Sequence, residues 1–346
     1  MPEVKKTSKN FSSLKAFLIF GTYFCDFVAN RFCLSPRLIM LILSMKKPIV
    51  SILLITWNRE KILKKTLAKI VSRDEVPGEV IVVDNNSQDG TEEMLKTTYP
   101  DCRYFKMKKN QGIKAYNLGA SQARGKYLLI LDDDSYPAEG SIKKMVKLFE
   151  EKPDAGIIPF NILHHETKEE YQTWHIPRVK GRVEAVNFLG CGAGIRTGLF
   201  RKVGYYPKCF FIYENELDVS LKVLQQGYKI IYDSSIVAYH DFSSSKRGMP
   251  NQIFYGSKNK LLLLWKYFPI KISLPLTIEF FLSSLLLSFK KGYRLLRCKA
   301  WLLAIIQSPG YLKEYPVKGS ISEDMLKKLQ PFLREFKLKT WINRLK

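Results

Sequence analysis

Residues Leu128–Pro137 read LLILDDDSYP, an apolar run that ends in three adjacent aspartates and a Ser-Tyr-Pro turn. The apolar run is typical of a buried β-strand, and the aspartates follow at its carboxyl end. Three carboxylates this close repel one another unless a cation or strong hydrogen-bond donors compensate them. Since the chain has a formal net charge of +24, this local concentration of negative charge is unusual and needs a compensating partner.

Similar strands precede this stretch and alternate with amphipathic helices. Ile49–Thr56 reads IVSILLIT and Glu79–Asp84 reads EVIVVD. Fully apolar strands that alternate with helices predict an α/β fold, with a mostly parallel central sheet covered by helices on both faces. Ligands of such sheets bind outside the carboxyl ends of the strands. We therefore expect Thr56, Asp84 and the triplet Asp132–Asp134 to converge.

Charge is distributed unevenly along the 346 residues and divides the chain into three parts. Residues 1–48 contain 8 basic and 2 acidic residues, residues 49–245 contain 28 and 25, and residues 246–346 contain 20 and 5. This predicts an apolar, basic leader at 1–48, a nearly neutral α/β domain at 49–245, and a basic helical region at 246–346. Cationic flanks of this kind favour contact with a polyanionic surface.

The leader has two interpretations. Its apolar segments, Phe11–Val28 and Leu38–Leu43, are each shorter than the ~20 apolar residues that a spanning helix needs. Met45 and the Lys-Lys-Pro that follows it resemble a natural protein start, directly before the first strong strand. The leader is therefore either a membrane-associating helix or an over-extended gene start.

The C-terminal region is predicted to attach to a membrane surface. Its segment Ile272–Phe289 is strongly apolar but contains Pro275 and Glu279, and an apolar segment with a basic side follows it. An amphipathic, basic pair of helices suits a membrane interface better than a crossing. The six cysteines form no CxxC pair, which favours a reducing cytoplasm. We therefore expect a peripheral protein on the inner face of the cell membrane.

The aspartate triplet predicts a metal site. Strand alternation puts Asp132 and Asp134 on one face and Asp133 on the other, so the outer two can share Mg²⁺ or Mn²⁺, and substrate phosphates usually complete such sites. The alternative is a solvated turn in which Asp134 or Ser135 caps a helix.

The ends of the first two strands carry candidate nucleotide contacts. Asp84 could accept a hydrogen bond from a ribose hydroxyl or a base N–H, and Asn86 follows it in an Asn-rich turn. Thr56, Asn58 and Arg59 stand at the corresponding place after the first strand. Plain strand–helix turns, with Arg59 in solvent, would explain the same residues.

A glycine-containing stretch, NQGIKAYNLGASQARG, begins at Asn110. Gly112 and Gly119 permit close approach of another backbone or of a bound nucleotide. The stretch matches neither the GxxxxGK[ST] phosphate loop nor the GxGxxG dinucleotide fingerprint. It is therefore a candidate donor-binding loop, with Asn117 as a further candidate.

The stretch FFIYENELDVSL offers a general base. A carboxylate in an aromatic-rich loop at a helix start, such as Glu214 or Glu216, can have a raised pKa. The alternative is that acidic residues of the first helical turn interact with the helix dipole, which explains Glu216 and Asp218 well.

His240 ends a later strand and is a candidate metal or diphosphate contact, although a lone histidine is often structural.

In this order, these motifs resemble the family 2 glycosyltransferases with the GT-A nucleotide-diphospho-sugar transferase fold, particularly bacterial and archaeal enzymes of cell-surface glycans. The resemblance covers about residues 49–268, including YGSKNKLLLLWKYFP. It implies base and ribose contacts by Thr56 and Asp84. It also implies a divalent metal, Mg²⁺ or Mn²⁺, held on the donor diphosphate by Asp132 and Asp134, with His240 nearby.

The remaining predicted site residues fall into two groups. The donor nucleotide is expected to contact Asn58, Arg59, Asn86, Asn110, Gly112, Asn117 and Asp133. The acceptor is expected to contact Trp174, Gly190, Cys191, Gly192 and Asp218.

The resemblance places the catalytic base at Glu216, with one departure from the family. The family usually reads Glu-Asp-x-Asp there, whereas this chain reads Asn215-Glu216-Leu217-Asp218. Because Glu214 lies two residues upstream, it is the alternative base.

The implied activity is inverting transfer of a hexosyl or deoxyhexosyl group from a nucleotide-diphosphate sugar to a glycan or polyprenyl-linked acceptor. The alternatives are a non-catalytic glycan- or nucleotide-binding relative and a nucleotidyltransferase. Nucleic acid is not an expected partner, because the basic residues lie in apolar flanks without an aromatic platform in a basic groove.

Overall fold

The structure is a computed structural model. It describes residues 48–71, 78–171, 173, 177, 179–241, 248–291, 293–316 and 321–337, without the side chains of 285–291. The predicted leader up to Lys47 and the predicted acceptor residue Trp174 lie outside the described residues.

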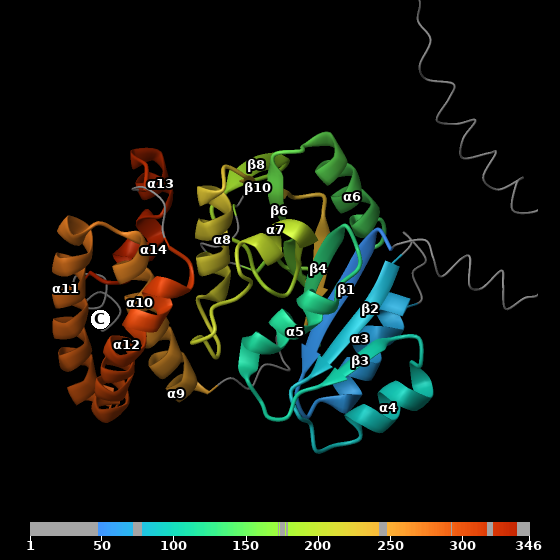
Figure 1. The fold of residues 1–346 in the computed structure, drawn as a ribbon, viewed down its shortest axis with the longest axis horizontal. Coiled ribbons are helices and arrows are strands. Elements are labelled where there is room, and N and C mark those ends of the chain that lie inside the picture. The colour runs from blue at the N-terminus through green and yellow to red at the C-terminus, as the bar shows by residue number, and fades with distance from the viewer. Residues whose placement is uncertain are drawn as a thin grey trace, which may run out of the picture. The chain divides into compact units, whose positions relative to one another are not determined.

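An eight-stranded sheet of order β3-β2-β1-β4-β9-β6-β10-β8 forms the centre of the fold (Figure 1). Neighbouring strands are parallel except at β4–β9, β6–β9 and β8–β10, so only β8 and β9 run against the others. The prediction of a mostly parallel sheet is therefore confirmed. The strands are β1 (Val50–Thr56), β2 (Gly78–Asp84), β3 (Arg103–Lys106), β4 (Tyr127–Asp132), β6 (Ala155–Pro159), β8 (Arg182–Ala185), β9 (Ala193–Arg196) and β10 (Lys229–Asp233).

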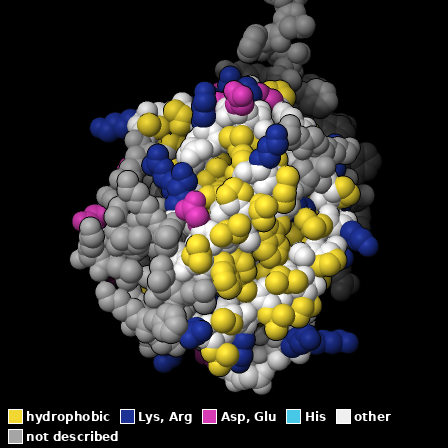
Figure 2. All heavy atoms as spheres, turned by 90° about the vertical axis from the view of Figure 1, so that its left-hand side faces the viewer, with side chains coloured by type: hydrophobic (Ala, Val, Ile, Leu, Met, Phe, Trp, Pro, Cys, Tyr) yellow, Lys and Arg dark blue, Asp and Glu magenta, His cyan; other side chains and the backbone are white. Residues whose placement is uncertain are grey.

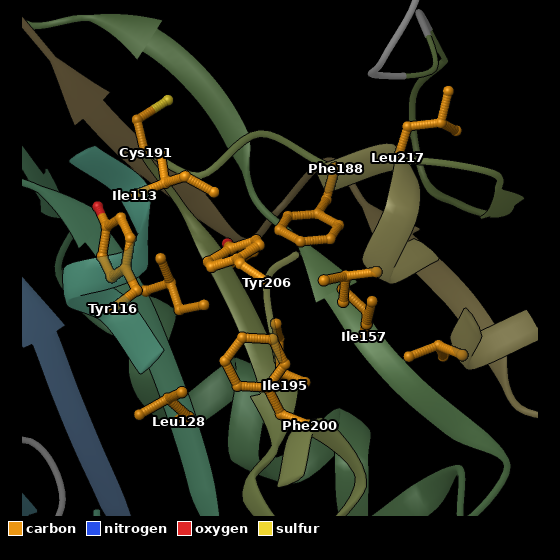
Figure 3. Close-up of a cluster of buried hydrophobic side chains, with 14 of the residues drawn as sticks. Ile113, Tyr116, Leu128, Ile157, Phe188, Cys191, Ile195, Phe200, Tyr206 and Leu217 are labelled. Atoms are coloured by element: carbon orange, nitrogen blue, oxygen red, sulfur yellow. The ribbon is translucent and has the colours of Figure 1, made fainter. Parts of the chain in front are cut away.

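The sheet is covered on both faces. Tyr127 to Leu131 of β4 are all fully buried, and successive side chains of a strand point to opposite faces. Figure 3 shows Leu128 of β4 and Ile195 of β9 in the same buried cluster as Phe200 and Tyr206. The helices of this part are α3 (Glu60–Val71), α4 (Thr91–Thr98), α5 (Ala115–Gln122), α6 (Ser141–Glu151), α7 (Thr197–Lys202) and α8 (Asn215–Gln225).

A second, three-stranded sheet brings distant parts of the chain to the end of β4. It consists of β5 (Ser135–Pro137), β7 (Asn161–His164) and β11 (Val237–His240), in the order β5-β11-β7. Strand β5 begins directly after the aspartate triplet and pairs antiparallel with β11, so that His240 lies opposite Ser135. This pairing positions a histidine beside aspartates about a hundred residues earlier in the chain.

The C-terminal region is helical, as predicted. Its elements are α9 (Met249–Asn251), the π-helical turn η3 (Gln252–Gly256), α10 (Ser257–Tyr267), α11 (Ile270–Lys291), α12 (Arg294–Glu314), α13 (Glu323–Lys328) and α14 (Gln330–Arg334). Helix α10 contacts α8, and the sheet and these helices belong to one compact unit (Figure 1). Among the helices that the structure describes, none has both the length and the hydropathy that crossing a membrane requires.

Gly119 of α5 provides a test of the packing between this helix and the sheet. A Cβ at Gly119 would lie 2.2 Å from Leu53 Cδ1 and 3.0 Å from Val83 Cγ2. We expect Gly119→Ala to lower the free energy of unfolding by about 1–3 kcal/mol, since overpacking a core costs more than the improved helix propensity gains.

Urea unfolding of the two proteins measures this difference. Gly198→Ala in α7 is the matched control, because no atom lies within 4 Å of its added Cβ, and it should be neutral or slightly stabilising. Equal stability of Gly119→Ala and the native chain would contradict the close approach of α5 to β1.

Candidate active site

A cluster of three potential metal ligands lies at the carboxyl end of β4. One ligand atom from each of Asp132, Asp134 and His240 lies within 4.8 Å of the other two. The Tyr116 hydroxyl donates to Asp132 Oδ1 at 2.9 Å and orients that carboxylate. Two carboxylates and an imidazole, once the imidazole gives up its proton to the solvent, form a donor set that fits Mn²⁺ or Mg²⁺, with positions left for substrate oxygens.

Asp133 has different neighbours from the other two aspartates. It is buried, its Oδ2 accepts a hydrogen bond of 2.8 Å from Thr56 Oγ1, and its Oδ1 contacts the Arg59 guanidinium. Burial raises the pKa of Asp133 to about 7, although Arg59 opposes the shift. Strand β4 ends at Asp132, so Asp133 and Asp134 lie in the turn that follows it and not in an alternating strand. Asp133 ties this turn to the loop after β1.

Positive charge compensates the triplet from two sides. Arg59 contacts both Asp133 and Asp134, at 2.8 Å from Asp134 Oδ2, while His240 Nε2 lies 2.9 Å from Asp134 Oδ1. Burial lowers the pKa of His240, but Cys191 and Asp134 outweigh it and raise this pKa to about 11. Cys191, a predicted acceptor residue, therefore interacts with a candidate metal ligand.

The predicted nucleotide contacts converge at the ends of β1 and β2. Asp84 is fully buried and accepts hydrogen bonds from the Ser87 N–H at 2.7 Å and the Tyr104 hydroxyl at 3.0 Å. Asn58 and Asn86 both have left-handed backbone, with φ of 53° and 68°. A hydrogen bond joins the loop after β1 to the loop after β2, since the Asn58 N–H donates to Ser87 Oγ at 2.8 Å. Donor binding by these residues stays a prediction.

In the glycine-containing loop, the structure shows protein contacts where a nucleotide was expected. Gly112 has φ of +60°, and a Cβ there would lie only 1.9 Å from the Phe211 carbonyl oxygen. Asn110 Oδ1 accepts from the Gly112 N–H at 2.9 Å. The Asn117 amide makes two hydrogen bonds with the Tyr206 backbone, of 2.9 and 3.1 Å. The interpretation of Asn117 as a donor ligand is corrected accordingly, because its amide fixes a loop.

The predicted base, Glu216, shares a cavity of about 1030 Å³ with Asp132 and Tyr116. A Cβ at Gly190 would lie 2.9 Å from Glu216 Oε1, so this glycine leaves room for the carboxylate. At Gly192, by contrast, a Cβ would meet Ile162 Cδ1 at 2.7 Å. Gly192 is therefore a core-packing position, which corrects its assignment to the acceptor.

Glu214, the alternative base, lines the same cavity but is engaged by a neighbour. Its Oε1 lies 3.7 Å from Lys260 Nζ, and Lys260 also contacts Glu335. Burial raises the pKa of Glu214 to about 7, with Lys260 lowering it and Glu335 raising it further. Both carboxylates line the cavity, and the assignment of the base to Glu216 rather than Glu214 stays a prediction.

Comparison with known proteins identifies the family to which the domain with these residues belongs. The family model described as glycosyl transferase family 2 matches residues 51–218, which include the aspartate triplet, Glu216 and the strands of the main sheet except β10. Residues 51–218 form a family 2 glycosyltransferase domain.

Two relatives illustrate the similarity in sequence. The glycosyltransferase is 23% identical over 266 residues, 69% of its length and 81% of the relative's, to a dolichyl N-acetyl-alpha-D-glucosaminyl phosphate 3-beta-D-2,3-diacetamido-2,3-dideoxy-beta-D-glucuronosyltransferase of Methanococcus voltae. It is 30% identical over 105 residues to a GalNAc(5)-diNAcBac-PP-undecaprenol beta-1,3-glucosyltransferase of Campylobacter jejuni. That second match covers 29% of this chain and 34% of the relative.

Two solved structures share the fold. A mannosyltransferase from Pyrobaculum calidifontis, in complex with GDP-Man and Mn²⁺, superposes with a TM-score of 0.51 at 19% identity, over 77% of this chain and 88% of that one. S. aureus TarS in complex with UDP-GlcNAc superposes with a TM-score of 0.53 at 17% identity, over 84% and 89%. The fold of the glycosyltransferase is therefore GT-A, as expected.

Asp218 has a different role from the acceptor contact expected from the sequence. It is fully buried and forms an ion pair of 2.6 Å with Lys222, one helical turn later. Its Oδ1 accepts hydrogen bonds from Tyr267 at 2.8 Å and from Tyr311 at 2.5 Å. Because these tyrosines belong to α10 and α12, Asp218 anchors the helix of Glu216 to the C-terminal helices and is inaccessible to an acceptor.

Sequence reasoning missed several residues of the site. These residues contact the site from segments that are distant in the sequence. They are Tyr116, whose hydroxyl binds Asp132, Lys260, whose amine contacts Glu214, and the partners of Asp218 on α10 and α12. The spacing of Asp218 and Lys222 was the one local signal, because residues four apart on a helix are neighbours.

We predict that Asp218→Asn strongly destabilises the glycosyltransferase. The substitution leaves Lys222, which is 1% exposed, without its counter-charge, and removing one partner of a buried ion pair costs about 3–5 kcal/mol. Thermal or urea unfolding measures the loss. Asp154→Asn, which removes an exposed pair with Lys229, is the control and should have little effect. Similar stabilities of the two variants would contradict the anchoring role.

Proposed function

We propose that this protein is an inverting, metal-dependent glycosyltransferase that moves a sugar from a nucleotide-diphosphate donor to a hydroxyl group of a glycan or polyprenyl-linked acceptor. One observation carries the proposal: Asp132 of the candidate metal cluster and the candidate base Glu216 line the same cavity. The names of the relatives, which mention dolichyl phosphate and diphospho-undecaprenol acceptors, support a lipid-linked acceptor.

The donor end of the site is formed by residues after β1, β2 and β4. Asp132, Asp134 and His240 would hold Mg²⁺ or Mn²⁺, which when bound neutralises the negative charge that develops on the leaving diphosphate. The loops that contain Asn58 and Asn86 would contact the nucleoside, and Asp84, which is buried and bonded to Ser87 and Tyr104, would support the second loop. Arg59, already beside Asp133 and Asp134, adds positive charge at this end.

At the acceptor end, Glu216 acts as general base. It takes the proton of the acceptor hydroxyl while the hydroxyl oxygen attacks the anomeric carbon. The bond from this carbon to the diphosphate oxygen breaks on the opposite face, so a single displacement inverts the configuration. General-base assistance typically contributes about 10²–10⁴-fold to the rate.

Two substitutions separate the donor and acceptor ends. With the native chain, one nucleotide sugar of a panel should raise the melting temperature when Mn²⁺ or Mg²⁺ is present. Asp134→Asn should abolish that increase and reduce transfer at least 100-fold, because it removes a metal ligand. Glu216→Gln should keep the increase but reduce kcat by about 10²–10⁴-fold.

Glu214→Gln is the matched control for the base, since it also changes a carboxylate in the cavity, and it should retain transfer. Full transfer by Glu216→Gln would exclude Glu216 as the base, and loss in Glu214→Gln alone would assign the role to Glu214. Metal-independent transfer by Asp134→Asn at the native rate would contradict the metal site.

We further propose that α11 and α12 attach the protein to the inner face of the cell membrane. Figure 2 shows hydrophobic side chains gathered over this side of the molecule, with Lys and Arg side chains at its margins. The exposed apolar residues include Ile270, Leu274, Ile278, Phe281 and Leu282 of α11 and Leu295, Leu302, Ile305, Ile306 and Leu312 of α12. Apolar helical faces with basic borders suit an anionic membrane surface.

Vesicle sedimentation tests this attachment. The native protein should sediment with vesicles that contain phosphatidylglycerol and much less with neutral phosphatidylcholine vesicles or duplex DNA. Replacing both Leu274 and Ile278 by Glu should weaken binding at least tenfold, since it removes exposed apolar contacts from α11. Val71→Glu, at an equally exposed apolar residue of α3, should bind normally. Undiminished sedimentation of the α11 variant would contradict the proposal.

A further inference from the structure

The turn that leads into the helix of the candidate base has an unusual backbone. Tyr213 and Glu214, directly before α8, have φ of 70° and 62°. Consecutive left-handed residues other than glycine are uncommon, because each Cβ lies too close to the following carbonyl oxygen. Such conformations persist only where surrounding contacts hold them. Since Glu216 lies in the first turn of α8, this turn sets where its carboxylate lies in the cavity.

Asn259 of α10 contacts the turn through its side-chain amide. The amide nitrogen donates hydrogen bonds to the carbonyl oxygens of Ile212 at 2.9 Å and of Tyr213 at 2.8 Å. These carbonyls belong to the peptide groups on either side of Tyr213, the first left-handed residue. Asn259 is fully buried, so loss of these bonds would leave both carbonyls without the donor that the fold supplies.

Other residues close to Asn259 in the sequence contact the same segment. The ring of Tyr255, in the π-helical turn η3, stacks on the ring of Phe211, with centroids 5.1 Å apart and an interplanar angle of 24°. Lys258 Nζ donates to the Cys209 carbonyl oxygen at 2.7 Å. Residues three and four apart on a helix are neighbours, and π-helical turns occur frequently at functional sites. One side of η3 and α10 therefore contacts the segment that leads into α8.

The same segment is also attached to the glycine-containing loop. The Ile113 N–H donates to the Phe211 carbonyl oxygen at 2.9 Å. Gly112 leaves room for that oxygen, since a Cβ there would lie 1.9 Å from it. The loop after β3 thus fixes Phe211, and α10 fixes the residues that follow it.

We propose that Asn259 is a positioning residue for the candidate base, because it holds the left-handed turn at Tyr213 and Glu214 so that Glu216 faces the acceptor hydroxyl. The proposal rests on the proposed function, in which Glu216 takes the proton of that hydroxyl. The described residues that line the cavity do not include Asn259, so it acts through the turn and touches no substrate.

Hydrogen exchange of the full chain, without any substrate, measures whether Asn259 holds the turn. We expect Asn259→Ala to speed amide exchange at least about tenfold in peptides that cover residues 211–217, because two hydrogen bonds are lost. Ser220→Ala is the matched control. It removes a buried hydrogen bond of α8, to Asn187 Oδ1 at 3.0 Å, but leaves the turn unchanged, so these peptides should exchange as in the native chain.

Hydrolysis of a nucleotide sugar by water, with Mn²⁺ present, measures the position of the base without an identified acceptor. UDP-GlcNAc and GDP-mannose are the probes. Asn259→Ala should lower kcat at least about tenfold, because a small displacement of a reacting group is costly. It should leave the KM of the donor within about threefold and keep the donor-dependent increase in melting temperature. Ser220→Ala should keep the native kcat.

Variants of Tyr255 keep the proposal testable if Asn259→Ala does not fold. Tyr255→Ala removes the ring that stacks on Phe211, and it should speed exchange and lower kcat in the same way but to a smaller extent. Tyr255→Phe keeps the ring and should behave like the native chain.

Three results would overturn the proposal. Native exchange rates in both Asn259→Ala and Tyr255→Ala would show that α10 does not hold the turn. Faster exchange with an unchanged kcat would show that the turn does not position the base. Loss of the donor-dependent increase in melting temperature in folded Asn259→Ala would assign this residue to the whole site instead of the base.

Failure of the proposed function gives a different pattern. The native chain would then show neither stabilisation by a nucleotide sugar nor its hydrolysis, while exchange would still respond to Asn259→Ala. That result would leave the turn held by Asn259 without a base to position, and it would overturn the positioning role together with the proposed function.

Discussion

Charge compensation at the carboxyl end of β4 is the constraint on which the site depends. Asp133 and Asp134 are buried next to Asp132, and such a group of carboxylates requires positive partners. The fold brings two positive partners from distant segments. Arg59 comes from the loop after β1 and His240 from β11. The pairing of β5 with β11 in the small sheet brings His240 next to Asp134 and so contributes to the charge balance of the site. The same geometry creates the donor set for a divalent metal.

A second buried charge connects this site to the C-terminal helices. Asp218 follows Glu216 by two residues on α8, and its partners Tyr267 and Tyr311 belong to α10 and α12. The position of the candidate base therefore depends on helices that are also proposed to contact the membrane. The C-terminal region completes the site, because its side chains line the cavity with Glu216. A separable membrane anchor would not have these buried contacts.

Taken together, these contacts bring three parts of the chain to one cavity. Asp132 of the candidate metal cluster lines it, and so do the candidate base Glu216 and side chains of α11 and α12. A base that deprotonates an acceptor hydroxyl must lie near both substrates, and Glu216 shares the cavity with Asp132. Such a layout suits transfer from a water-soluble donor to a membrane-bound acceptor.

The sequence by itself determined the α/β class, the strand ends that converge, and the family, because apolar runs followed by polar turns are local patterns. The sequence predicted that Asp133 differs from Asp132 and Asp134, but the reason is tertiary: β4 ends at Asp132, and Thr56 and Arg59 contact Asp133 in the turn that follows. Only the tertiary structure decided the roles of Asn117, Gly192 and Asp218, whose neighbours are Tyr206, Ile162 and the helices α10 and α12. An amide, a glycine or a carboxylate has the same local signature in a ligand site as in a buried contact. Which one it becomes depends on groups far along the chain that the fold brings next to it.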